Sequence, residues 1–171
     1  MGMIKVPAEA LKKFQMHYQD IFKTGNLAEG KWNTELSNYY KKYVGAFNAI
    51  PFASNGSALI AILMLLKRYQ GYKQVFIQAN TMYGVKTIAI SSGLDFIGYV
   101  PCSIDSLMPT TDQVNEFING ISRPEETIFI LTHIGGIVNP DIISIVSACD
   151  KLGIAVVEDC AHSLGSTLNK R

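Results

Sequence analysis

The sequence predicts an α/β fold, a three-layer arrangement in which a mostly parallel sheet has helices on both faces, preceded by a helical N-terminal arm. From residue 46 onward, short runs rich in β-branched and aromatic residues alternate with longer amphipathic segments. Gly71, Gly93 and Gly153 follow three of these segments, where glycine commonly ends helices. Because alternating strands and helices are joined by right-handed crossovers, the strands should run parallel.

The expected strands are short apolar runs, at residues 46–53, 74–78, 95–100, 127–132 and 154–158. The expected helices between them cover residues 57–69, 83–92, 111–121 and 140–152. Thr110 or Thr111 can cap the third helix, and Asn139 followed by Pro140 opens the fourth. Two further helical patterns, at residues 8–23 and 34–43, come first. We therefore expect an arm of residues 1–45 and one domain of residues 46–171.

The composition argues against several classes of partner. The chain has 171 residues, 48% of them apolar, which is enough for one substantial core. Its formal charge is +1, with acids and bases interspersed, so we expect neither nucleic acid nor an anionic membrane as partner. The longest apolar run, residues 58–66, is well below the ~18 residues that a membrane span needs. No signal-peptide pattern opens the sequence, and we expect a cytoplasmic protein.

Cysteine and histidine spacing argue against a disulfide framework and against a metal site. The three cysteines, Cys102, Cys149 and Cys160, are odd in number and form no C-x-x-C pair. The three histidines show no i, i+4 spacing, and no cysteine–histidine cluster occurs. Cys160 lies beside the candidate site described next, where it is either a nucleophile or a small buried packing residue.

The segment from Ser54 to Ser57 is a candidate phosphate-binding turn. It follows an apolar run and opens a strongly apolar helix, whose free N–H groups and dipole favour an anion. Gly56 would let the backbone approach the anion, and the Ser57 hydroxyl could donate a further hydrogen bond. The same residues also form an ordinary turn and helix N-cap, so both interpretations remain open.

A carboxylate and an imidazole follow the last predicted strand. Asp159 comes directly after this apolar run, and His162 lies three residues later. A carboxylate beside a pyridine nitrogen favours the protonated ring, which is the better electron sink for carbanion chemistry. His162 could donate to a ring hydroxyl or position a water; alternatively, Asp159 caps the next segment and His162 is a core histidine. Together with the phosphate turn, these residues favour pyridoxal 5′-phosphate as cofactor.

Several segments, in the right order, resemble the N-terminal half of the DegT/DnrJ/EryC1/StrS aminotransferases. This family consists of fold-type I pyridoxal-phosphate enzymes that mostly aminate nucleotide-linked keto-sugars. Residues 53–59 resemble its S-N-G-T-A-A-L segment, residues 81–93 its T-F-x-A-T-A-N-A stretch, residues 132–136 its V-H-L-Y-G, and residues 157–165 its I-E-D-A-A-Q/H-A-x-G. The resemblance implies an incomplete large domain of the pyridoxal-phosphate transferase fold.

The resemblance assigns cofactor contacts to six residues: Gly56 and Ser57 for the phosphate, Asp159 for the pyridine nitrogen, His162 for the ring hydroxyl, and Met82 and Tyr83 for the ring face. Met82 is a departure, because the family usually has an aromatic ring there, and neighbouring Tyr83 could substitute with altered geometry. Gly135 stands where the family usually has tyrosine, which would leave the site more open.

The family's Schiff-base lysine lies beyond the segment that matches residues 157–165, and Lys170 does not correspond to it. No catalytic residue is therefore expected in this chain, which would be inactive alone. The resemblance implies that the complete enzyme takes a nucleotide-sugar substrate and an amino donor, as in cell-surface polysaccharide biosynthesis. It also implies a homodimer or association with a complementary chain.

Two other hypotheses remain. The chain could be a non-catalytic remnant that folds and associates with a complete homologue. It could also be a plain nucleotide-binding α/β module, although that hypothesis rests on fold alone and the G-x-G-x-x-G fingerprint is absent. Weak, non-covalent affinity for the cofactor would favour the aminotransferase interpretation.

Overall fold

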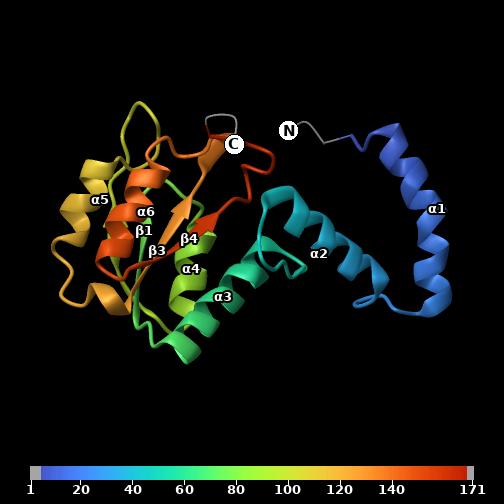
Figure 1. The fold of residues 1–171 in the computed structure, drawn as a ribbon, viewed down its shortest axis with the longest axis horizontal. Helices are drawn as coiled ribbons and strands as arrows, with labels where there is room; N and C mark the ends of the chain where they lie inside the picture. Colours follow the sequence, from blue (N-terminus) through green and yellow to red (C-terminus); the bar gives the residue numbers. More distant parts are fainter. Residues whose placement is uncertain (1–4, 169–171) are drawn as a thin grey trace. The chain divides into compact units, whose positions relative to one another are not determined.

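A computed structural model describes residues 5–168 of the chain. The chain divides into two compact units, Met1–Pro51 and Phe52–Arg171 (Figure 1). The first unit contains helices α1 (Ala8–Thr24) and α2 (Lys31–Val44). The second contains, in chain order, α3 (Asn55–Gln70), β1 (Gln74–Gln78), α4 (Tyr83–Ser91), β2 (Asp95–Val100), α5 (Thr111–Ile118), β3 (Thr127–Thr132), α6 (Ile142–Lys151) and β4 (Ala155–Asp159).

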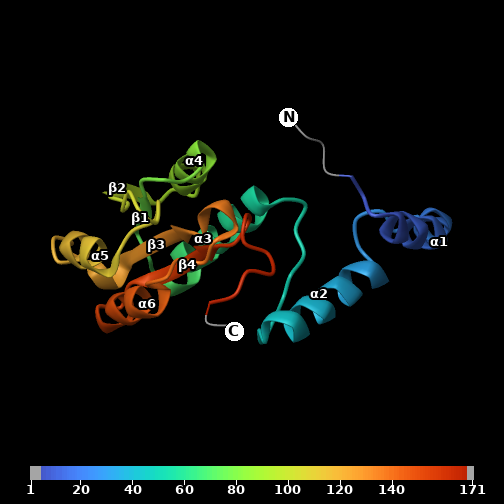
Figure 2. The same cartoon turned by 90° about the horizontal axis from the view of Figure 1, so that it is seen from above.

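The four strands form one parallel sheet in the order β2-β1-β3-β4, which confirms the predicted α/β class. The two central strands are buried along their whole length, as expected when helices cover both faces. Figure 2 shows α4 and α6 on opposite sides of the strands. The carboxyl ends of all four strands therefore meet at one edge of the sheet.

Each face of the sheet has its own core, because successive side chains of a strand point to opposite faces. On one face, Val75 and Ile77 of β1 pack with Leu59 and Leu63 of α3 and with apolar residues of α4. On the other face, residues of α5 and α6 pack on Phe76 and on Phe129 of β3. The rings of Phe76 and Phe129 are stacked, with centroids 4.5 Å apart. The alternation thus determines on which face each polar residue at a strand end lies.

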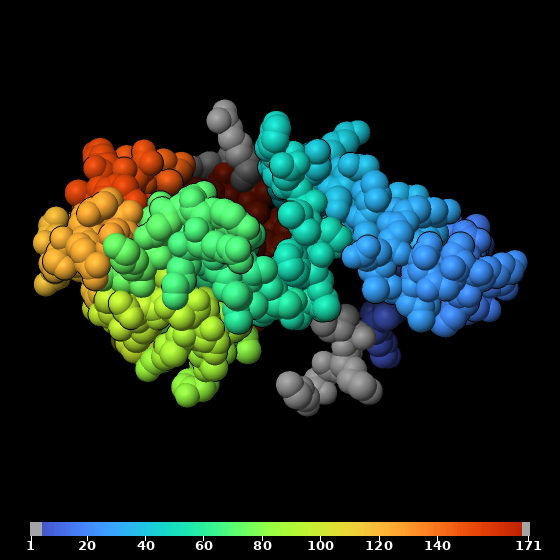
Figure 3. Space-filling model, turned by 90° about the horizontal axis from the view of Figure 1, so that it is seen from below, coloured from blue at the N-terminus to red at the C-terminus, as the bar shows by residue number. Residues whose placement is uncertain are grey.

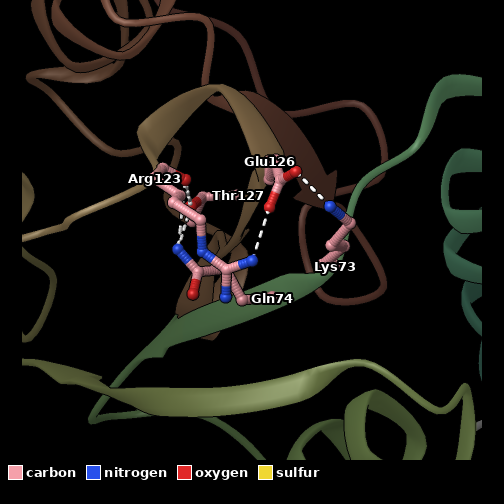
Figure 4. A network of polar contacts seen from close by, with 5 residues as sticks. All are labelled: Lys73, Gln74, Arg123, Glu126 and Thr127. Carbon is pink, nitrogen blue, oxygen red and sulfur yellow. Dashed lines mark hydrogen bonds and ion pairs between the residues drawn. The ribbon is translucent and has the colours of Figure 1, made fainter.

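The amino ends of β1 and β3 are joined by a network of polar side chains (Figure 4). Gln74 donates from Nε2 to Thr127 Oγ1 (2.7 Å) and to the Arg123 carbonyl (3.1 Å). Glu126 pairs with Arg123, at 2.8 Å, and with Lys73. These contacts lie at the end of the sheet opposite to the predicted site, so they serve the fold rather than the chemistry.

The expected strand at residues 46–53 is wrong. The structure has neither helix nor strand there, and the side chain of Phe47 is 91% exposed. Pro51 supplies no N–H for a ladder, and no strand among residues 5–168 pairs with this segment. An apolar run alone was therefore insufficient evidence for a strand.

Three expected strands, Gln74–Gln78, Asp95–Val100 and Thr127–Thr132, have the predicted bounds, and β4 begins one residue later than expected. The helix expected at residues 140–152 is shorter, Ile142–Lys151, and Asn139 does not cap it. The Asn139 side chain instead donates to the Pro109 carbonyl (2.9 Å) and accepts from the Asp141 N–H (2.8 Å). The helix expected at residues 111–121 ends at Ile118.

Helices α1 and α2 bury none of their residues, although both carry large apolar side chains. The exposed ones include Phe14, Phe22, Tyr39 and Tyr43. In the second unit, α3 also exposes Ile62, Met64, Leu65 and Tyr69. Figure 3 shows in green a surface to which this part of the chain contributes. Both units therefore present apolar surface. None of the helices described between residues 5 and 168 is long and apolar enough to span a membrane.

A bulge between β1 and β2 depends on Gly98. The register shifts between Val75 and Phe76, and Gly98 has a φ of 140°. A Cβ at Gly98 would lie 3.4 Å from the ring of Phe117. We predict that Gly98→Ala destabilises the protein by about 1–3 kcal/mol, because alanine rarely adopts this φ. Thermal unfolding measures the change.

The matched control is Gly84→Ala, in the first turn of α4. No atom lies within 4 Å of a Cβ at Gly84, and its φ is outside the positive range. This substitution should stabilise the fold by up to roughly 1 kcal/mol. Equal unfolding temperatures for the two variants would contradict the role given to Gly98.

Candidate active site

Four of the predicted site residues, Met82, Tyr83, Asp159 and His162, lie at or after the carboxyl ends of strands that meet at one edge of the sheet. Asp159 is the last residue of β4, and Thr132, the last of β3, is its partner in the register. The Thr132 hydroxyl lies 2.9 Å from the hydroxyl of Thr81, which follows β1. Met82 and Tyr83 come next along the chain and open α4. The structure therefore brings the segments around residues 81–83 and 159 to neighbouring strand ends.

The N-terminus of α3 is closed by a capping box between Ser54 and Ser57. Ser54 Oγ accepts from the Ser57 N–H, and Ser57 Oγ accepts from the Ser54 N–H, both at 3.1 Å. Ser57 Oγ also donates to the Ser54 carbonyl at 2.8 Å. The capping interpretation is therefore realised in this structure. To donate to a phosphate, the Ser57 hydroxyl would have to leave this carbonyl, so its phosphate contact stays a prediction.

The backbone N–H groups of Asn55 and Gly56 are better donors to an anion than Ser57, whose N–H and hydroxyl are used in the capping box. They precede Ala58, whose N–H makes a hydrogen bond to the Ser54 carbonyl (3.1 Å) as the helix begins. Gly56 has a packing role as well, because a Cβ there would lie 3.3 Å from Ile88 Cδ1 of α4. The glycine therefore allows close contact between α3 and α4, whether or not an anion binds.

Asp159 is 7% exposed and is held by two donors at one oxygen. Its Oδ1 accepts from Asn55 Nδ2 at 2.7 Å and from the Ala161 N–H at 3.1 Å. Within the described residues, no protein donor reaches Oδ2. Asp159 thus caps the following segment, as one interpretation expected, and still has an oxygen available for a ligand. Its role toward a pyridine nitrogen stays a prediction.

The remaining predicted contacts lie on open surface. Met82 and Tyr83 are 64% and 83% exposed, and with Thr81, Lys86 and Tyr99 they line part of a pocket of about 400 Å³. His162 is also exposed, so the alternative of a core histidine is wrong. The side chains assigned to the ring face and to the ring hydroxyl are therefore accessible to a ligand.

A second polar cluster was missed in the sequence. His133 follows β3 and is almost fully buried, and its Nε2 lies 2.9 Å from Glu158 Oε2. Cys160 completes the cluster, with all three candidate ligand atoms within 4.8 Å of one another. Residues 133 and 158–160 meet only because β3 pairs with β4. Their position directly after two apolar runs was the available signal.

The ring of His133 is oriented unfavourably for a metal ion. The Asn139 N–H donates to Nδ1 at 3.1 Å, so the ring proton of the neutral form is on Nε2, which faces Glu158. A metal-bound histidine usually presents one bare nitrogen to the ion and donates from the other. The cluster is therefore better suited to hydrogen bonding than to metal ligation.

Cys160 is exposed, so the interpretation of a buried packing residue is wrong. The buried thiol is Cys149 in the core beneath α6, where desolvation raises its pKa to about 11. Burial disfavours the thiolate of Cys149. Of these two thiols, only Cys160 is both accessible and close to the candidate site.

The comparisons with known proteins agree with the motifs. The sequence matches the profile of the DegT/DnrJ/EryC1/StrS aminotransferase family over residues 9–171. Because this match covers nearly the whole chain, the chain belongs to that family. The resemblance inferred from the four sequence segments is confirmed.

Several solved structures share the fold. A DegT DnrJ EryC1 StrS aminotransferase from Brucella abortus superposes with a TM-score of 0.80 at 20% identity, over 96% of this chain and 45% of that chain. NtdA from Bacillus subtilis, with bound cofactor PMP, gives 0.77 at 18% identity, over 96% and 38%. The sugar aminotransferase CalS13 from Micromonospora echinospora gives 0.55 at 22% identity, over 65% and 30%. The chain thus spans less than half the length of each of these proteins.

The charge state of His133 provides a test of the cluster. Hydrogen bonds to the Cys160 and Glu158 side chains act to raise the pKa of His133, whereas burial of its ring acts to lower it. The Asn139 N–H opposes protonation, because a proton on Nδ1 would face this donor in a buried place. We expect this opposing effect to prevail at pH 7.

The prediction is a neutral His133 ring at pH 7 with its proton on Nε2. Nitrogen-15 NMR of the labelled side chain distinguishes one bare and one protonated nitrogen from two protonated ones. Exposed His17 serves as the internal reference, because its ring has no such donor on Nδ1 among the hydrogen bonds of the described residues. Two protonated ring nitrogens at pH 7 would contradict the Asn139 hydrogen bond.

Proposed function

We propose that this chain is the N-terminal portion of a pyridoxal-phosphate-dependent aminotransferase that acts on a nucleotide-linked keto-sugar in the cytoplasm. The observation that carries the proposal is Asp159, a buried carboxylate at the end of β4 with one oxygen held by Asn55 and Ala161 and the other available. Its neighbour, the N-terminus of α3, favours an anion. Family membership supports the same conclusion.

The residues present fit the two ends of the cofactor. The Asn55 and Gly56 N–H groups and the α3 dipole would bind the phosphate, and the Asp159 carboxylate would hold a proton on the ring nitrogen. Met82 and Tyr83 would cover the ring, and His162 would donate to its hydroxyl. When bound, pyridoxal phosphate supplies an electron sink for bond breaking at the α-carbon of an amino donor.

Inactivity of the chain alone is part of the proposal. The resemblance puts the family's catalytic lysine beyond the segment that matches residues 157–165, so the lysine would come from sequence outside this chain. Asp159 and the α3 N-terminus would then bind and orient the cofactor, while another segment supplies the nucleophile. An amino donor such as glutamate and the keto-sugar nucleotide would be the substrates of the assembled enzyme.

A non-catalytic remnant is the second candidate, and one observation favours it. The N–H and hydroxyl of Ser57 are both engaged in the capping box, which lowers the number of donors available to a phosphate. Such a remnant would keep the fold and bind little or no cofactor. Cofactor binding therefore separates the two candidates.

We predict that the chain binds pyridoxamine 5′-phosphate weakly and that Asp159→Asn reduces the affinity roughly ten- to hundred-fold. The substitution keeps the size of the side chain and the Oδ1 acceptor but removes the negative charge; hydrogen bonds to charged groups are worth about 1.5–3 kcal/mol. Pyridoxamine phosphate is the probe because it lacks the aldehyde that reacts with surface lysines. Equilibrium dialysis measures the binding.

The control is Asp150→Asn, which makes the same charge change on an exposed position of α6. It should leave the affinity unchanged. Binding by Asp159→Asn as tight as that of the parent chain would overturn the site assignment, and absence of binding by the parent would favour the remnant.

We also propose that the chain associates with a second copy or with a complementary chain. The support is the exposed apolar surface of α1 and α2, which bury none of their own residues. Contiguous apolar surface of this kind commonly marks an interaction site. We predict that Phe14→Ser and Phe22→Ser together shift the chain toward monomer.

Light scattering coupled to gel filtration measures the mass at several concentrations. Ile104→Ser is the control, because it removes an even more exposed apolar side chain from a loop of the second unit. A parent chain that stays monomeric at every concentration would contradict the association.

A further inference from the structure

We propose that Asn55 is a positioning residue that fixes the orientation of the Asp159 carboxylate toward the ring nitrogen. The inference rests on the proposed function, because it concerns the carboxylate that would meet the cofactor. Neither the sequence motifs nor the family resemblance assigned Asn55 any role beyond the turn. The evidence is the hydrogen bond from Asn55 Nδ2 to Asp159 Oδ1, at 2.7 Å, between residues 104 positions apart.

The sheet determines on which face Asp159 meets Asn55. Val157 packs against the core beneath α3 and α4. Asp159 lies two residues later in the same strand, so its side chain is on the same face, where α3 begins. Glu158 is on the opposite face and contacts His133 instead. The apolar alternation of β4 thus selects Asp159, not Glu158, as the carboxylate next to α3.

Two donors at the same oxygen leave a defined free atom. Asn55 Nδ2, from far earlier in the chain, and the Ala161 N–H, two residues after Asp159, both donate to Oδ1. Because both donors hold Oδ1, rotation of the carboxyl group is restricted and Oδ2 is left for a ligand. Loss of Asn55 would leave only the local contact from the Ala161 N–H, in the turn after the strand.

The amide of Asn55 suits this position better than a cation would. It donates a hydrogen bond to the carboxylate without bringing a positive charge of its own. A lysine or arginine here would pair with Asp159 and compete with a protonated ring nitrogen for the same charge. Asn55 therefore leaves the full negative charge of Asp159 for the ligand.

Asn55 also links the two ends of the ligand. It is the first residue of α3, and its backbone N–H belongs to the same turn as that of Gly56, which would face the phosphate. One rigid helix start thereby holds both the phosphate donors and the partner of the ring-nitrogen carboxylate. A shift of α3 would move both together.

The experiment uses this chain and pyridoxamine 5′-phosphate labelled with nitrogen-15 in its ring. Dialysis gives the affinity, and the ring-nitrogen chemical shift against pH gives the protonation of the bound ligand. Asn55→Ala should weaken binding about ten-fold and lower the pH at which the bound ring loses its proton by about one unit. Asn55→Gln keeps the amide and should restore the affinity to within about three-fold.

Asn115→Ala, in α5 on the other face of the sheet, is the matched control and should change neither quantity. Thermal unfolding verifies that each variant is folded. If Asp159→Asn weakens binding but Asn55→Ala matches the parent in affinity and ring protonation, this inference fails and the proposed site stands. If both variants match the parent, the proposed site fails as well.

Discussion

The parallel pairing of β3 with β4 is the constraint on which the candidate site depends. It puts Thr132 opposite Asp159 and brings His133 next to Glu158. A slip of one residue in this register would turn Asp159 away from α3 and Glu158 toward it, because side chains alternate along a strand. The slip is opposed by the apolar residues of β4, which pack into the two cores in turn. The hydrophobic cores and the polar site are therefore specified by the same alternation.

The fold was largely predictable, because buried parallel strands have sequences that are continuous apolar runs between predicted helices. Three strands have the bounds read from the sequence, and the parallel class followed from the alternation with helices. The segment 46–53 is also apolar, yet it is mostly exposed and unpaired among the described strands. The composition of a segment indicates that it could form a strand, but it does not indicate whether another strand is available to pair with it. The prediction that Asn139 opens α6 failed for a related reason. Its side chain donates to the distant Pro109 carbonyl, a contact that local capping preferences do not include.

The candidate site was predictable only in part, for a physical reason. Asp159 could be found because a carboxylate directly after an apolar strand lies at the sheet edge where ligands bind. Asn55 and His133 acquire their partners through the strand order β2-β1-β3-β4, which the sequence alone does not specify. Ser57 remained ambiguous because a hydroxyl at a helix start suits a cap and an anion equally, and the structure realises the cap.

The hydrogen bond between Asn55 and Asp159 also has a consequence for the order of folding. It joins residues 104 positions apart, so it cannot form until β4 has joined the sheet. The helices and the β1–β2 pair depend on contacts that are much closer in sequence, and local contacts are generally made earlier. This side of the candidate site would then be assembled late. Binding of a ligand at this position would therefore report whether β4 has joined the sheet, because an intermediate without β4 lacks Asp159 at the site.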